Sequence, residues 1–155
     1  MAPSPSSSGT IIRLAFLLEA LFNILGAAVI LLYPATCLSY FVPKPHITTT
    51  TSVSLVQWLA ALILGLTPQL VLALPNSRKA VDSRPMVYTT LAWGEACLMP
   101  VLIWHAFVES GLSPRAMGIC VGNLLPIFCW RLYVLWWKPE WFGRVKEVER
   151  EKKAQ

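Results

Sequence analysis

The sequence has few charged residues. Asp, Glu, Lys and Arg make up 14% of its 155 residues, whereas a soluble globular domain carries about 25%. Hydrophobic residues make up 55%, and the mean hydropathy is +0.57. This composition excludes an ordinary soluble domain and indicates one compact domain within a membrane.

The sequence also lacks the motifs that bind common cofactors. Its four cysteines form no CxxC pair, and its two histidines do not lie at metal-ligand spacing from them. No metal site is therefore predicted. It has no glycine-rich nucleotide loop, haem motif or serine-nucleophile signature. Any chemistry is therefore expected to need no cofactor.

Four long apolar runs are present, each close to the roughly 20 residues that a helix needs to cross a bilayer. No basic segment precedes the first run, so it is interpreted as a retained span and not as a signal peptide. The predicted spans cover residues 11–33, 53–74, 86–108 and 116–137. We therefore predict an all-α integral membrane four-helix bundle, with a disordered segment at 1–10 and a charged tail at 138–155.

Hydroxyl residues and prolines mark the expected helix boundaries. A loop is expected at 34–52, where the hydroxyls of Thr48–Thr51 suit the start of the second span. Ser83 or Asp82 is expected to cap the third span, with Pro85 in its first turn.

Basic residues are distributed unevenly between the two sides of the predicted bundle. The side that holds both termini has nine Lys and Arg in its loop and tail, and the opposite loops have two. Basic loops stay in the cytosol, so both termini are expected to be cytoplasmic. These charges flank the spans, which favours contact with membrane lipids over binding to nucleic acid. The nine are Arg78, Lys79, Arg84, Lys138, Arg144, Lys146, Arg150, Lys152 and Lys153, and the two are Lys44 and Arg115.

The C-terminal tail carries two further signals. Lys152 and Lys153 stand fourth and third from the C-terminus, which resembles the dilysine retrieval signal of endoplasmic reticulum membrane proteins. Two adjacent lysines in a basic tail also occur by chance. Aromatic residues are expected to anchor the last span at the cytoplasmic interface: Trp136, Trp137, Trp141 and Phe142.

Three ionisable residues lie inside the predicted spans at similar depth. Measured from the cytoplasmic end at about 1.5 Å per residue, Arg131 lies about 9 Å in, Glu19 about 12 Å and Glu95 about 14 Å. A charge at such depth costs about 2.5 kcal/mol or more. The shared depth predicts that the three side chains form a cluster inside the bundle.

This predicted cluster has two interpretations. One guanidinium offsets only one carboxylate, and desolvation and like charge favour the protonated form of the second carboxyl group. Glu95 or Glu19 would then suit acid or base catalysis on a lipophilic molecule, with Arg131 setting their charge states. Alternatively, the ion pairs only hold the helices together.

Other polar residues rank lower. Asn23 lies one turn beyond Glu19 on the same helix face, and Asn123 lies on the fourth span. Both are candidates for positioning a substrate, and a hydrogen bond between them that only stabilises the bundle is the alternative. His105 has no carboxylate or cysteine at its depth and is a weaker candidate for catalysis.

The end of the fourth span reads CWRLYVLWWKPEWFGR. In these residues, and over most of the chain in hydropathy, the sequence resembles small uncharacterised fungal four-span membrane proteins, some encoded within natural-product gene clusters. Fungal membrane-bound terpene cyclases and sterol isomerases offer an architectural analogy, because they use intramembrane acidic residues on lipophilic substrates. The resemblance implies a part in secondary-metabolite biosynthesis, such as a cyclase or isomerase reaction.

Three functions are therefore considered. The first is an enzyme that acts on a lipophilic small molecule. The second is a non-catalytic adaptor, or a partner subunit of a membrane enzyme complex, whose polar groups only fix helix pairing. A transporter is third, because four spans are few and no inverted repeat is visible.

The retrieval signal can be tested directly. Replacing Lys152 and Lys153 by Ser is expected to let the protein leave the endoplasmic reticulum, as scored by fluorescence microscopy against organelle markers. Replacing Arg144 and Lys146 by Ser removes the same charge and should leave the location unchanged. An unchanged location of the Lys152 and Lys153 variant would contradict the signal.

Overall fold

The computed structural model describes residues 9–42, 48–108 and 111–143. Its four long helices are α1 (Thr10–Leu32), α3 (Thr50–Leu72), α4 (Arg78–Phe107) and α5 (Pro114–Trp137). Two short helices, α2 (Pro34–Phe41) and the 3-10 helix η2 (Pro139–Phe142), follow α1 and α5. Each long helix is long and apolar enough to cross a membrane. The predicted all-α membrane bundle is confirmed.

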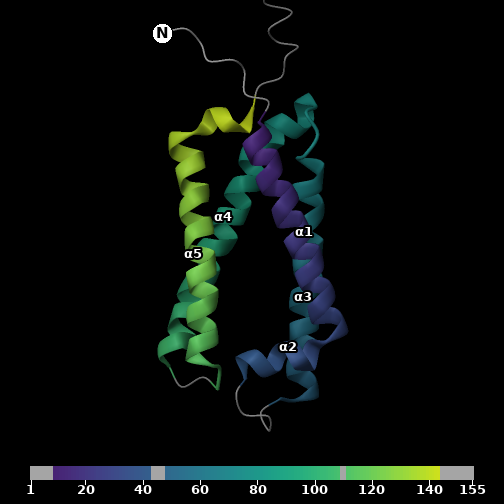
Figure 1. Ribbon diagram of the computed structural model, residues 1–155, viewed down its shortest axis with the longest axis vertical. Helices are drawn as coiled ribbons and strands as arrows, with labels where there is room; N and C mark the ends of the chain where they lie inside the picture. Colours follow the sequence, from purple (N-terminus) through teal and green to yellow (C-terminus); the bar gives the residue numbers. More distant parts are fainter. Residues whose placement is uncertain (1–8, 43–47, 109–110, 144–155) are drawn as a thin grey trace, which may run out of the picture.

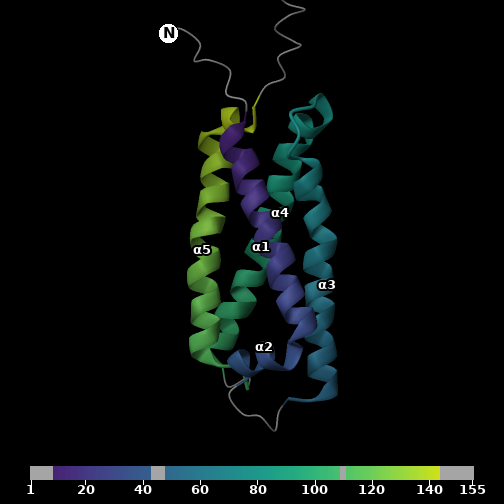
Figure 2. The ribbon, with the colours of Figure 1, turned by 45° about the vertical axis from the view of Figure 1, so that its right-hand side comes forward.

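The long helices run alternately up and down (Figure 1). α1 begins and α5 ends at one end of the bundle, which we call the terminal end, and α2 lies at the opposite, loop end. α1 packs along α3, and α4 packs along α5. The two pairs diverge toward the loop end, as the turned view in Figure 2 also shows.

The main hydrophobic core lies toward the terminal end and joins all four long helices to η2. At the loop end the backbone N–H of Ser113 donates to the Phe41 carbonyl at 2.7 Å and holds α2 against the start of α5. The two helix pairs are therefore joined at both ends. The core consists of Ile12, Phe16, Ala20, Leu70, Ala73, Val87, Tyr88, Val134 and Phe142.

A reciprocal capping box begins α3. The N–H of Ser52 donates to the Thr49 hydroxyl at 3.2 Å, and the N–H of Thr49 donates to the Ser52 hydroxyl at 2.9 Å. The expected start within Thr48–Thr51 is confirmed. The loop predicted at 34–52 is partly wrong, because Pro34 ends α1 and then occupies the first turn of α2, where its missing N–H is not needed.

The predicted start of α4 is also wrong. The Ser77 hydroxyl accepts a hydrogen bond from the Ala80 N–H at 3.3 Å, so the helix begins at Arg78. Ser77 has the same capping chemistry as the expected Ser83 but lies earlier in the chain. Asp82, Ser83 and Pro85 therefore lie within α4, beyond its first turn.

The aromatic residues predicted as an interfacial anchor, at the end of α5 and in η2, do not share one environment. Trp136 and Trp137 are exposed, as an interfacial anchor requires, whereas Phe142 is buried in the core. The prediction for Phe142 is wrong because η2 turns this side chain back onto the ring of Tyr88, with ring centroids 5.5 Å apart. The expectations for residues 1–8, Lys44 and the tail from 144 to 155 concern parts outside the described residues.

Arg84 is fully buried at the terminal end, although the sequence placed it in an exposed basic loop. Its guanidinium donates to the carbonyl oxygens of Ala73 at 3.0 Å, Pro75 at 2.9 Å and Phe142 at 2.6 Å. The side chain thus ties the end of α3 and the end of η2 to α4. These carbonyls offset the buried charge, because carbonyls left over at a helix end carry partial negative charge.

Glycine is required where the two ends of the described chain approach Arg84. Gly9 has φ 63° and Gly143 has φ 91°, and both values lie in the region that side chains disfavour. A Cβ atom at Gly9 would also collide with Arg84 Nη1 and would lie 2.8 Å from the Phe142 carbonyl oxygen. Arg84, Gly9 and Gly143 therefore form one closely packed cluster.

We expect Arg84→Met to lower the free energy of unfolding by about 3 kcal/mol, because it leaves several buried carbonyls without donors. Thermal unfolding in mild detergent measures the loss. Arg78→Met is the matched control, since its side chain is 75% exposed and lies 4.0 Å from Asp82. Equal stability of the two variants would contradict the structural role of Arg84.

Candidate functional site

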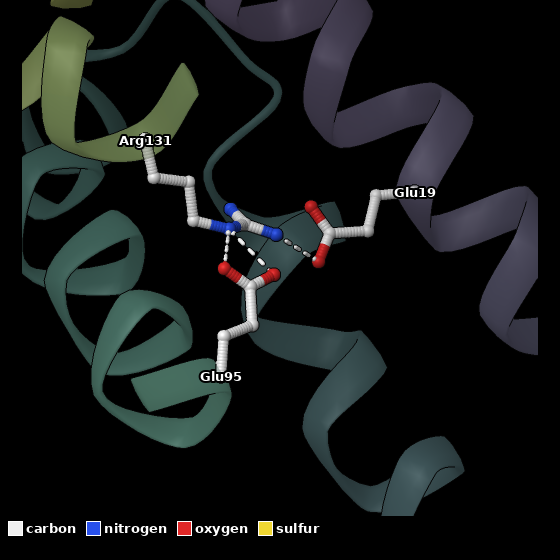
Figure 3. A network of polar contacts seen from close by, with 3 residues as sticks. All are labelled: Glu19, Glu95 and Arg131. Carbon is white, nitrogen blue, oxygen red and sulfur yellow. Dashed lines mark hydrogen bonds and ion pairs between the residues drawn. The ribbon is translucent and has the colours of Figure 1, made fainter. Parts of the chain in front are cut away.

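Glu19 on α1, Glu95 on α4 and Arg131 on α5 point toward one another (Figure 3). Arg131 Nε donates to the two carboxylate oxygens of Glu95 at 2.9 and 3.0 Å. Arg131 Nη2 donates to Glu19 Oε1 at 2.6 Å. The contacts predicted from depth are therefore present, and we call these three residues the Glu–Arg cluster.

The three side chains are not equally accessible. Arg131 is 2% exposed, Glu95 is 12% exposed and Glu19 is 24% exposed. The positive charge is enclosed by its partners, and the more accessible negative charge belongs to Glu19. Removing one member of such a buried pair leaves a charge without compensation, which costs more than the loss of a surface ion pair.

Packing of the hydrophobic core orients the side chains of the Glu–Arg cluster. Phe16 precedes Glu19 by three residues, and Val134 follows Arg131 by three residues. Both hydrophobic residues are fully buried. Residues three apart share a helix face, so packing of the core directs Glu19 and Arg131 toward the space between the helices.

Tyr88 is a fourth component, and the sequence analysis missed it. Its ring centroid lies 5.0 Å from the guanidinium carbon of Arg131, within reach of a cation–π interaction. The ring also packs edge-on against Phe16 and Phe142, at 5.6 and 5.5 Å between centroids. A signal existed, because Tyr88 lies seven residues before Glu95 and therefore on the same face of α4.

A cleft of about 720 Å³ adjoins the Glu–Arg cluster. α1 and α5 form its two sides, and α4 contributes Tyr88 and Glu95. Outside the cluster its lining is largely apolar, with two asparagines as exceptions. The lining residues are Ala15, Leu18, Glu19, Phe22, Asn23, Tyr88, Glu95, Asn123, Leu124, Pro126, Ile127, Trp130 and Arg131.

Both asparagines predicted to position a substrate lie in this lining. Asn123 Nδ2 donates to the Ile119 carbonyl at 2.8 Å, one turn back on its own helix. The hydrogen bond considered between Asn23 and Asn123 is therefore replaced by one within α5. His105, the weaker candidate, is not among the residues that line the cleft.

The Glu–Arg cluster contains two acids and one base. When both carboxyl groups are ionised it carries one negative charge in excess, so it can take up one proton or one positively charged ligand group. Among the described residues, no three His, Cys, Asp or Glu side chains are grouped to hold a metal ion. No protein-family model matches the chain, and neither a curated protein nor a solved structure matches it.

We expect Arg131→Met to destabilise the bundle by about 3 kcal/mol, because two partly buried carboxyl groups lose their counterion. Adding Glu19→Gln and Glu95→Gln to this variant should recover part of the loss. Thermal unfolding in mild detergent measures both effects. Arg115→Met, which changes an exposed arginine near the loop end, is the control. Wild-type stability of Arg131→Met would contradict this account.

Proposed function

We propose that the protein is an endoplasmic reticulum membrane enzyme that acts on a lipophilic small molecule by acid–base chemistry. The observation that carries the proposal is the Glu–Arg cluster in the wall of a largely apolar cleft. Cyclisation or isomerisation is the reaction class we favour, because both can proceed by proton movement without a cofactor. A substrate from secondary metabolism is consistent with the resemblance to fungal four-span proteins.

Each residue of the site would have its own role in the reaction. In an isomerisation, a protonated carboxyl group donates its proton to one carbon of a double bond. The resulting carboxylate then takes a proton from a neighbouring carbon, so the carboxyl group ends as it began. Glu19 or Glu95 would carry this proton, and Arg131 would compensate the other carboxylate. Asn23 and Asn123 would orient polar groups of the substrate.

The size and lining of the cleft support a small-molecule substrate. Ligand sites commonly enclose about 300 to 1,000 Å³, with mostly apolar walls and a few polar groups. The cleft of about 720 Å³ lies within that range. Its sides belong to two membrane-spanning helices, so a substrate dissolved in the bilayer would reach it without crossing water.

The proposed location rests on charge and on the tail. The excess of basic residues on the side that holds both termini favours a cytosolic C-terminus. Lys152 and Lys153 then stand where coat proteins would recognise a retrieval signal. The aromatic residues Trp136 and Trp137 suit a membrane interface.

A non-catalytic adaptor is the second candidate. One observation favours it, a groove of about 430 Å³ that α4 and α5 form away from the cleft. Ala92 and Ala96 are among the residues that line it, and small side chains let a neighbouring helix approach closely. In that function the Glu–Arg cluster would only fix the pairing of helices.

The two candidates are separated by Glu95→Gln. Lipophilic molecules that copurify with the full-length protein in mild detergent are first identified by mass spectrometry, and their conversion is then measured in nanodiscs. For an enzyme, Glu95→Gln should leave expression and location intact and slow conversion by about 100-fold or more. Asp82→Asn makes the same charge change outside the cleft and should convert normally.

The result has clear alternatives. If Glu95→Gln and Glu19→Gln both convert the molecule at the wild-type rate, the proposed chemistry is wrong. If Glu95→Gln mainly reduces recovery of a copurifying membrane protein, the adaptor is favoured instead.

A further inference from the structure

The charges at the cleft are arranged asymmetrically. Glu19 and Glu95 are 24% and 12% exposed, whereas Arg131 is 2% exposed. Arg131 is the only base among the residues that line the cleft, and the two glutamates are its acids. A ligand in the cleft therefore meets a carboxylate before it can meet the guanidinium.

Two of the three guanidinium nitrogens of Arg131 are already hydrogen-bonded to carboxylates. Its Nε is occupied by both oxygens of Glu95, and its Nη2 is occupied by Glu19. The ring of Tyr88 lies against it, 5.0 Å from centroid to Cζ. An anion beside Arg131 would lie next to both carboxylates, and it would add further negative charge at a depth where charge is costly.

Glu19, by contrast, has an oxygen to offer. Its Oε1 accepts the hydrogen bond from Arg131. Its Oε2 accepts no hydrogen bond from any residue that the structure describes. Both oxygens of Glu95 face the same Arg131 nitrogen. Glu19 is thus the acid better placed to receive a donor group from a ligand.

We propose that the cleft binds a lipophilic molecule that carries a positively charged nitrogen, such as a protonated amine, with Glu19 as its counterion. The bound cation restores neutrality to a cluster with two carboxylates and one guanidinium. Phe22 and Trp130 also line the cleft, and aromatic rings attract cations. This inference rests on the proposed function, because it presumes that the cleft takes a lipophilic small molecule. With the cation bound both carboxyl groups are ionised, so the proton transfer would begin with Glu95 taking a proton from the substrate and returning it to another carbon.

Three photoreactive probes test the inference. They share one dodecyl chain with a diazirine group and differ in the head, which is a protonated primary amine (the ammonium probe), a sulfonate or a hydroxyl group. Each is equilibrated with the full-length protein in phosphatidylcholine nanodiscs and irradiated, and the labelled peptides are quantified by mass spectrometry. Labelling of the cleft walls on α1 and α5 is divided by labelling around Leu62, a lipid-facing residue of α3 that is 67% exposed. This ratio corrects for different partition of the probes into the bilayer.

The ammonium probe is expected to label the cleft at least about tenfold more than the sulfonate probe, the preference that a hydrogen bond to a charged group supports. Glu19→Gln should reduce the preference to about twofold or less, whereas Asp82→Asn should retain it. If Glu19→Gln does not fold, the comparison of probes on the wild-type protein decides alone, and Glu19→Asp should keep the ammonium preference.

Some results would overturn only the cation site, and others would also overturn the proposed function. Equal or stronger labelling by the sulfonate probe, or an ammonium preference that persists in Glu19→Gln, would overturn the cation site. Equal labelling by the hydroxyl and ammonium probes would also overturn it, while a cleft for lipophilic molecules would stand. If no probe labels the cleft above the α3 reference, the cation site and the proposed small-molecule function both fail.

Discussion

Arg131 contacts two carboxyl groups inside a bundle whose long helices are apolar enough to face lipid. The core and Tyr88 hold these side chains in place. Glu19 comes from α1, whereas Glu95 and Arg131 come from the two helices of the other pair, α4 and α5. The cluster therefore links α1 to α4 and α5. The core residues Phe16 and Val134 fix the faces from which Glu19 and Arg131 project. Tyr88 covers the guanidinium. The same arrangement leaves a negative edge toward the cleft.

Two buried arginines show two ways of placing a cation in an apolar surrounding. Arg131 is compensated by carboxylates, which can gain or lose a proton or turn toward another partner. Arg84 is compensated by the carbonyls of Ala73, Pro75 and Phe142, which hold fixed dipoles and cannot titrate. The first arrangement suits chemistry, because its charge can change. The second suits a permanent joint between elements, and it lies at the terminal end, away from the cleft.

The depth of ionisable residues along a helix can be read from the sequence, because a fixed rise per residue converts position into depth. This is why the meeting of Glu19, Glu95 and Arg131 could be predicted. Local capping was less certain, since Ser77 and Ser83 have the same chemistry and only packing selects between them. The contacts of Arg84 with the Phe142 carbonyl, and of the Phe142 ring with Tyr88, could not be predicted, because they depend on η2 folding back onto the bundle. The cleft was missed for a similar reason, since it depends on how the two helix pairs diverge.

The order of the cluster along the chain has a consequence for biogenesis. Glu19 precedes Arg131 by 112 residues and Glu95 precedes it by 36, so a ribosome delivers both acids to the insertion machinery before their common base exists. An ionised carboxylate in a half-assembled hairpin would face the full cost of entering lipid. The insertion machinery therefore has to accommodate both acids before their counterion is made. The three side chains can pair only once α5 is in place.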